Sequence, residues 1–191
     1  MKAVFASRNK HKAEQVAVLL DGVELLPLDE VAPTLELHEP FDTFEANALA
    51  KARTVHQATG MTAIADDSGL EVDALDGRPG VVSARYSGDD ATDDANNAKL
   101  IAELAGVPPE KRTARYRCVA VCVSDSGELV AEGSCEGHIV DDPRGDLGFG
   151  YDPHFVPEGE QRTMGEIPLD EKLAFSHRGR AFRALAARLG L

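Results

Sequence analysis

Residues 61–70 read Met-Thr-Ala-Ile-Ala-Asp-Asp-Ser-Gly-Leu, and the rest of the chain can be arranged around them. An apolar run leads to two adjacent carboxylates, Asp66 and Asp67, and Ser68 and Gly69 follow as typical turn residues. The pattern predicts a buried strand that ends at the two acids. Because side chains alternate along a strand, one carboxylate should face a site while the other turns toward the scaffold. The pattern alone equally allows a solvated Asp-Ser-Gly turn.

Apolar patterns on both sides of this stretch predict an α/β protein. The predicted strands are residues 2–6, 23–28, 61–67, 70–75, 113–124 and 128–140, and the predicted helices are residues 10–21, 43–58, 93–105 and 177–189. Residues 113–124 are apolar on both faces, which indicates a central strand. The Asp-Ser-Gly turn at residues 125–127 should return that strand as a hairpin.

Composition indicates one globular domain. The chain has 191 residues, of which 43% are hydrophobic and 28% charged. It has no apolar run of the roughly 20 residues that a membrane span needs, and its first residues enter a strand without room for a signal peptide. Cys118, Cys122 and Cys135 are odd in number and lack metal-ligand spacing, so we expect reduced core cysteines in a cytoplasmic protein.

The charge distribution argues against a nucleic-acid partner. The net charge is −13, whereas a nucleic-acid backbone attracts a basic surface. Basic residues nevertheless cluster near both ends of the chain, which fits a small polyanion better than a polymer. The acidic segment 89–94 precedes a predicted helix, where carboxylates complement the helix dipole; a metal site is the alternative interpretation.

Two further segments have the composition of ligand sites. Ser7-Arg8-Asn9 separates a predicted strand from a predicted helix that carries Lys12, an arrangement that favours phosphate; the alternative is a plain N-cap with a solvated lysine. The glycine-rich segment 144–153 carries Phe149 and Tyr151. These rings either stack on a base or pack a hairpin loop against the protein.

Together these segments resemble the inosine/xanthosine triphosphate pyrophosphatase family. The matching motifs are Ala6-Ser7-Arg8-Asn9-Lys10-His11-Lys12, Thr43-Phe44-Glu45-Ala46-Asn47-Ala48, Ala65-Asp66-Asp67-Ser68-Gly69-Leu70, Ser83-Ala84-Arg85-Tyr86, Gly148-Phe149-Gly150-Tyr151-Asp152-Pro153 and Ser176-His177-Arg178-Gly179. They occur in the family's order from end to end of the chain. The chain departs from the family pattern at Ser7, at Ala46 and in the loop after Glu39, where the family more often has Thr, Glu and a glycine.

The resemblance implies an Mg²⁺-dependent hydrolase that converts dITP, ITP or XTP into the monophosphate and pyrophosphate. The implied fold is a long twisted mixed sheet with flanking helices, in a single 1–191 domain of two lobes around a central nucleotide cleft. A homodimer is implied, with neither nucleic acid nor membrane as a partner. Two alternatives are a pyrophosphatase for other modified nucleotides and a nucleotide-binding module without turnover.

The resemblance also implies roles for individual residues. Asp67 would be the catalytic residue and a metal ligand, and Glu39 the second metal ligand, with Glu45 as its substitute. Phe149 would stack on the purine, and His177 and Arg178 would face its 6-keto oxygen. The full set implied for substrate binding is Ser7, Arg8, Asn9, Lys10, His11, Lys12, Ser68, Phe149, Gly150, Tyr151, Asp152, Lys172, His177 and Arg178.

Overall fold

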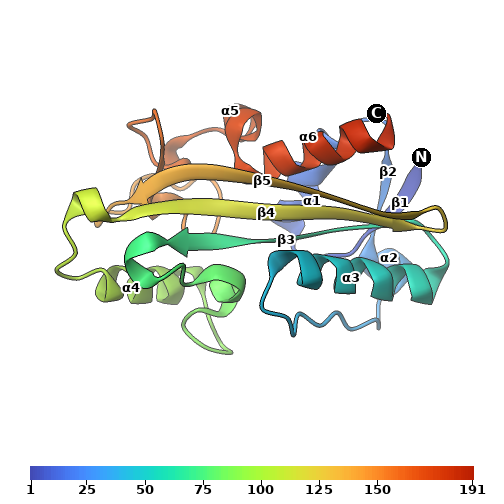
Figure 1. The fold of residues 1–191 in the computed structure, drawn as a ribbon, viewed down its shortest axis with the longest axis horizontal. Coiled ribbons are helices and arrows are strands. Elements are labelled where there is room, and N and C mark those ends of the chain that lie inside the picture. The colour runs from blue at the N-terminus through green and yellow to red at the C-terminus, as the bar shows by residue number, and fades with distance from the viewer. The chain divides into compact units, whose positions relative to one another are not determined.

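The computed structural model describes residues 1–191 and contains one mixed six-stranded sheet with flanking helices (Figure 1). The strand order is β2-β1-β3-β4-β5-β6. The strands are β1 (Lys2–Phe5), β2 (Glu24–Pro27), β3 (Ala63–Val72), β4 (Thr113–Ser124), β5 (Gly127–Ile139) and β6 (Phe155–Pro157). The α-helices are α1 (Lys10–Leu19), α2 (Leu28–Val31), α3 (Phe44–Thr59), α4 (Asp93–Glu103), α5 (Leu169–Phe175) and α6 (His177–Leu189).

The chain forms two compact units. Unit 1 comprises Met1–Asp67, Cys118–Gly133 and Arg178–Leu191, and unit 2 comprises Ser68–Arg117 and Ser134–His177. β3, β4 and β5 each contribute one part to each unit. The chain therefore passes from one unit to the other within the motifs that contain Asp67 and His177.

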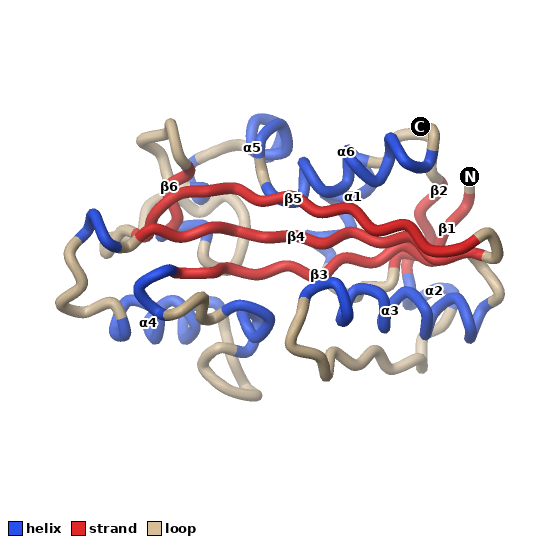
Figure 2. The backbone as a smooth tube through the Cα atoms, in the orientation of Figure 1, coloured by secondary structure: helices blue, strands red, loops and turns tan.

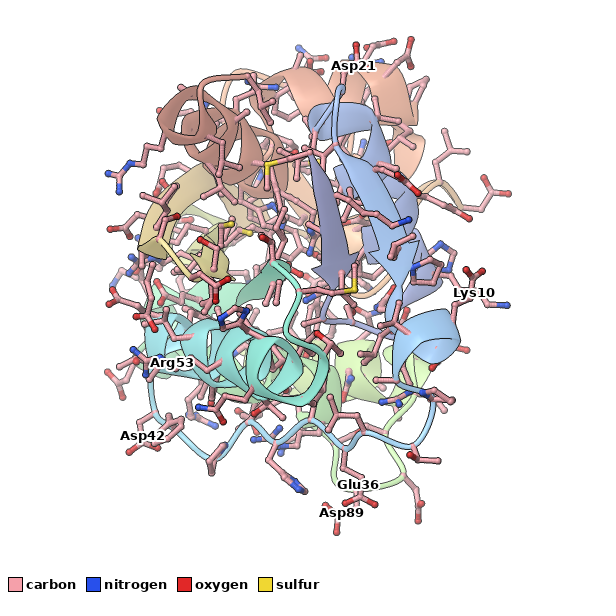
Figure 3. The ribbon with its side chains drawn as sticks, turned by 90° about the vertical axis from the view of Figure 1, so that its right-hand side faces the viewer. Lys10, Asp21, Glu36, Asp42, Arg53 and Asp89 are labelled. Atoms are coloured by element: carbon pink, nitrogen blue, oxygen red, sulfur yellow. The ribbon has the colours of Figure 1, made fainter.

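Unit 1 contains the parallel part of the sheet. β1 pairs in parallel with β2 on one side and with β3 on the other. α1 and α6 pack on one face of these strands, and α3 lies on the opposite face (Figures 1 and 3). The core under α1 and α6 is built from Ala3, Phe5, Val16, Leu20, Ile64, Cys118, Ala120, Cys122, Ala131, Ala181, Phe182 and Leu185. Figure 2 shows the connection from α2 to α3 as an extended loop that runs alongside α3.

Unit 2 has its own core. The buried side chains come from β3, β4, β5, α4 and the segment around β6: Leu70, Val72, Leu75, Tyr86, Leu100, Leu104, Ala114, Tyr116, Cys135, Ile139, Tyr151, Phe155 and Met164. All three cysteines of the chain are unpaired and buried, which confirms the prediction of reduced core cysteines. Cys118 and Cys122 belong to the core of unit 1, and Cys135 belongs to the core of unit 2.

Most predicted elements are confirmed, and two predictions are wrong. The predicted strand 70–75 ends at Val72, and Asp73–Leu75 form a 3₁₀ turn. The strand 113–124, the hairpin that follows it, and the four long helices all form within two residues of the predicted bounds. The predicted break at Ser68 and Gly69 does not exist, because β3 continues through both residues to Val72. Gly69 and Leu70 are buried in the sheet, and this tertiary context overrides the local turn preference. No helix is long and apolar enough to cross a membrane.

Candidate functional site

Asp66 and Asp67 lie in the middle of β3, just beyond the end of its neighbour β1. The β1–β3 register ends at Phe5 and Ile64, and the Ser7–Asn9 turn and α1 follow β1 directly. Ligands of α/β sheets bind at this carboxyl edge of parallel strands. Strand alternation sends Asp66 to the face that carries α1 and α6, and Asp67 to the face that carries α3. Neighbouring carboxylates therefore occupy different environments.

Asp66 binds two cations in the interior of unit 1. Its Oδ2 lies 3.2 Å from Lys12 Nζ and accepts hydrogen bonds of 3.3 Å from both Nε and Nη2 of Arg178. Arg178 Nη1 also donates to Gln15 Oε1 at 2.8 Å. Burial would raise the pKa of Asp66, but Lys12 and Arg178 outweigh it and hold the pKa well below its usual range. Asp66 thus remains ionised and holds in place two cations that the resemblance assigns to the substrate.

The pKa of Asp67 is shifted in the opposite direction, above its ordinary value. Its Oδ2 accepts a hydrogen bond of 3.2 Å from Asn47 Nδ2, and Lys51 Nζ lies 3.7 Å from its Oδ1. The Lys51 ammonium also donates to Glu39. The pKa of Asp67 is raised to about 6: burial is the main cause, Lys51 opposes it, and the nearby charge of Glu39 adds to it. A carboxylate with a pKa near neutrality can accept a proton during catalysis.

Asp67 and Glu39 fit a divalent cation. Both carboxylates contact the same ammonium group, so their negative charges converge on one point that a cation already occupies. No group of three or more His, Cys, Asp or Glu side chains forms a complete protein cage for a metal. Mg²⁺ does not need one, since it commonly keeps several waters and binds one or two carboxylates plus substrate phosphates. Glu45, the substitute for Glu39, is exposed in the first turn of α3.

The turn after β1 serves as a helix cap and as an anchor for a loop. Asn9 is the N-cap of α1, and its side chain accepts from the Lys12 amide at 3.1 Å. Arg8 binds Asp29 and the carbonyls of two residues in the loop after α2. Lys12 is not solvated as the N-cap alternative predicted, because its ammonium pairs with Asp66. Lys10 points away from the protein (Figure 3), and His11 is also exposed.

Unit 2 contains a second polar cluster, centred on Asp152. Lys172 Nζ donates to Asp152 Oδ2 at 2.8 Å and to the Leu147 carbonyl at 3.2 Å. The Tyr116 hydroxyl donates to Asp152 Oδ1 at 3.1 Å, and its ring stacks on His177 with centroids 4.7 Å apart. A Cβ on Gly148 would lie 2.1 Å from Asp152 Oδ2 and 2.6 Å from Lys172 Nζ. A side chain at position 148 would therefore displace the ion pair, and the positive φ of 109° also favours glycine there.

The structure divides the predicted residues between the two units. Unit 1 holds residues 7–12, Glu39, Asp67 and Arg178, and unit 2 holds Ser68, residues 149–152, Lys172 and His177. Sequence reasoning missed four residues that contact these clusters: Gln15, Asn47, Lys51 and Tyr116. For two of them a signal existed, because Asn47 and Lys51 are polar residues one helical turn apart on the apolar, buried face of α3.

Comparison with known proteins identifies the family of the chain. The model of the Ham1 family matches residues 3–188. A dITP/XTP pyrophosphatase of Geobacter sulfurreducens is 50% identical, over 99% of this chain and 96% of the relative, and one of Nitratidesulfovibrio vulgaris is 52% identical, over 95% and 92%. The solved structure of the Staphylococcus aureus Ham1 protein superposes with a TM-score of 0.91 at 36% identity, covering 100% of this chain and 98% of that one. The chain belongs to the Ham1 family.

Proposed function

We propose that this protein hydrolyses dITP, ITP and XTP to the monophosphate and pyrophosphate. Relatives that match nearly the whole chain carry the name dITP/XTP pyrophosphatase. The single observation that carries the proposal is the Asp66–Asp67 pair, in which one carboxylate holds Lys12 and Arg178 while its neighbour has a pKa of about 6. Such a pair combines cations for a polyphosphate with a base for water.

The residues of unit 1 supply the chemistry. Membership of the family implies a divalent metal, which we propose to be Mg²⁺ held by Asp67 and Glu39; when bound, it offsets charge on the phosphate oxygens. Asp67 accepts a proton from a water whose oxygen bonds to the α-phosphorus, and the bond to the bridging oxygen breaks as pyrophosphate leaves. Lys12 and the amides after Ser7 neutralise negative charge on the triphosphate.

The residues of unit 2 supply recognition of the base. Phe149 stacks on the purine, and Tyr151 and Asp152 shape the surface around it. His177 directs a hydrogen-bond donor at the 6-keto oxygen of the purine, and the resemblance assigns the same task to Arg178. The 6-amino group of adenine would leave such donors unpaired, and unpaired buried donors discriminate strongly between substrates. Hypoxanthine and xanthine satisfy them.

A substrate panel tests the proposed function. Pyrophosphate release from dITP, XTP, dATP and a set of modified nucleotides is measured with and without Mg²⁺. We expect metal-dependent release from dITP and XTP and little release from dATP. Faster turnover of another modified nucleotide would favour a pyrophosphatase for other modified nucleotides, and binding without release would favour the non-catalytic module.

We also propose, from the resemblance, that the protein is a cytoplasmic homodimer. Light scattering measures the number of chains in the particle.

Replacing Lys12 by alanine should mainly weaken binding of the triphosphate. We expect KM for dITP to rise about tenfold or more, because a charge-assisted contact to phosphate contributes roughly 1.5–3 kcal/mol. Arg53→Gln on α3 is the control, since it removes one positive charge from an exposed ion pair with Glu128. A Lys12→Ala enzyme with unchanged KM and kcat would show that α1 does not meet the phosphates.

A further inference from the structure

Resting on the proposed function, we propose that Asp93 and Asn97 are positioning residues that set the orientation of Phe149. The two residues lie one turn apart on α4 and hydrogen-bond the backbone amide and the backbone carbonyl of Gly150. We call these two hydrogen bonds the grip. The Gly150 amide donates to Asp93 Oδ2 at 2.7 Å, and Asn97 Nδ2 donates to the Gly150 carbonyl at 2.9 Å. From the sequence alone, Asp93 was only one carboxylate of the acidic segment 89–94, and Asn97 had no assigned role.

The grip acts on the peptide plane that Phe149 shares with Gly150. The Gly150 amide and the Phe149 carbonyl belong to one rigid peptide group, so Asp93 fixes the rotation of the backbone next to the ring. Gly150 has a φ of 64°, a left-handed conformation in which a glycine backbone rotates freely unless it is held. The next residue, Tyr151, is fixed by its hydroxyl, which donates to the Ser83 carbonyl at 2.7 Å.

The helix that carries this grip is itself firmly held in unit 2. Leu100 in the last turn of α4 and Leu104, which follows the helix directly, are fully buried. Thr92 caps the N-terminus of α4 by accepting from the Ala95 amide at 3.2 Å. The Asn96 side chain accepts a hydrogen bond from the Ser87 amide at 2.8 Å, which fixes the segment before α4 to the first turns of the helix. α4 is therefore a rigid support against which the position of the Phe149 backbone is set.

This grip is separate from the ion pair on the other side of the loop. Lys172 and Tyr116 hold the Asp152 side chain, whereas Asp93 and Asn97 hold only the backbone of Gly150. Loss of the α4 contacts should therefore misorient the stacking ring while the Asp152 cluster remains intact. Because stacking depends on ring geometry, the cost should fall on purine binding and not on the chemical step.

The matched test compares Asp93→Ala with Asp94→Ala. Both variants remove one exposed carboxylate from the first turn of α4, but only Asp93 accepts a hydrogen bond from the Gly150 amide. For Asp93→Ala we expect KM for dITP to rise about three- to tenfold with kcat changed by less than about twofold, as loss of one strong hydrogen bond predicts. Asp94→Ala should match the wild type, and Asp93→Asn, which keeps an acceptor oxygen, should recover most of the loss.

Two further measurements separate positioning from a general structural effect. Imidodiphosphate has no base, so its inhibition constant should be the same for Asp93→Ala and the wild type. In a double-mutant cycle, Asp93→Ala should add little to Phe149→Ala, because the grip has no ring left to orient. Additive effects, or an equal loss of imidodiphosphate affinity, would overturn the assignment.

Binding of inosine monophosphate, measured by calorimetry, keeps this inference distinguishable from the proposed function. If the wild-type protein binds the monophosphate but releases no pyrophosphate from dITP, the proposed hydrolysis fails while the positioning role is still judged by the dissociation constant. That constant should rise in Asp93→Ala and not in Asp94→Ala. An unchanged constant in Asp93→Ala removes the positioning role, whatever the enzyme hydrolyses.

Discussion

Asp67→Asn is expected to lower kcat for dITP by about 10³-fold or more while nucleotide binding largely survives. The substitution removes the group that accepts the proton from water, an effect that usually amounts to about 10²–10⁴-fold, and it removes one of two carboxylates proposed for the metal. Steady-state pyrophosphate release measures kcat, and calorimetry with a nonhydrolysable triphosphate analogue measures binding. Near-normal turnover in the variant would remove Asp67 from the chemistry.

The same substitution should stabilise the metal-free protein at alkaline pH. The folded pKa of Asp67 is about 6, above its ordinary value of 3.8, so the stability associated with the protonated form is lost as pH rises from about 4 through 6. Asparagine keeps the shape without the buried charge. We expect a gain of about 1–3 kcal/mol in the free energy of unfolding at pH 8, and none at pH 4.

Urea denaturation at the two pH values measures this effect. Glu45→Gln is the control, because Glu45 is an exposed carboxylate in the first turn of α3. A stability gain that is equal at pH 4 and pH 8 would show that burial of the Asp67 charge is not its cause. Added Mg²⁺ should stabilise the wild type and not the variant, because binding to the folded state stabilises it.

Arg178→Gln is expected to destabilise unit 1 by about 3–5 kcal/mol, the usual cost of breaking a buried ion pair from one side. Arg178 is 3% exposed and Asp66 is 1% exposed, so water cannot replace the lost partner. The free energy of unfolding in urea measures the loss. Arg180→Gln on the same helix is the control, because Arg180 is exposed and its replacement should cost less than about 0.5 kcal/mol.

Acid sensitivity gives this prediction a second readout. The lowered pKa of Asp66 contributes stability that is present above about pH 4 and is lost as pH falls below it. In Arg178→Gln that loss should be smaller, since the pKa of Asp66 returns toward its ordinary value. Asp66→Asn combined with Arg178→Gln should cost less than the sum of the single variants. Additive costs would contradict a coupled pair.

The sequence predicted the long elements because their signals are local. Thr43 at the N-cap of α3 and Gly60 at its C-cap, in a left-handed conformation, are visible in the sequence as start and stop signals. The short elements α2, α5 and β6 have three to seven residues, too few for a periodic pattern. The continuation of β3 past Gly69 depends on burial in the sheet, which local turn preferences do not encode.

The site was predicted only where residues occur in motifs. Asp67, Lys12 and Arg178 were predicted as site residues because each lies in a recognisable motif, whereas the ion pairs of Lys12 and Arg178 with Asp66 required coordinates. Lys51 was missed because it belongs to no motif, although its place on the apolar face of α3 was a usable signal. Tyr116 was missed because it lies inside an apolar strand, where an aromatic residue is first read as core. Contacts between distant segments decide such roles.

Because each unit has a buried cysteine in its core, local unfolding of each unit can be followed by chemical labelling. Cys118 is held in the core of unit 1, where burial first and the nearby Asp66 charge second raise the pKa of its thiol, and Cys135 is held in the core of unit 2. Neither thiol can react with an alkylating reagent until its own surroundings open. Mass spectrometry of time-resolved labelling would therefore report local opening separately at each position, without engineered probes.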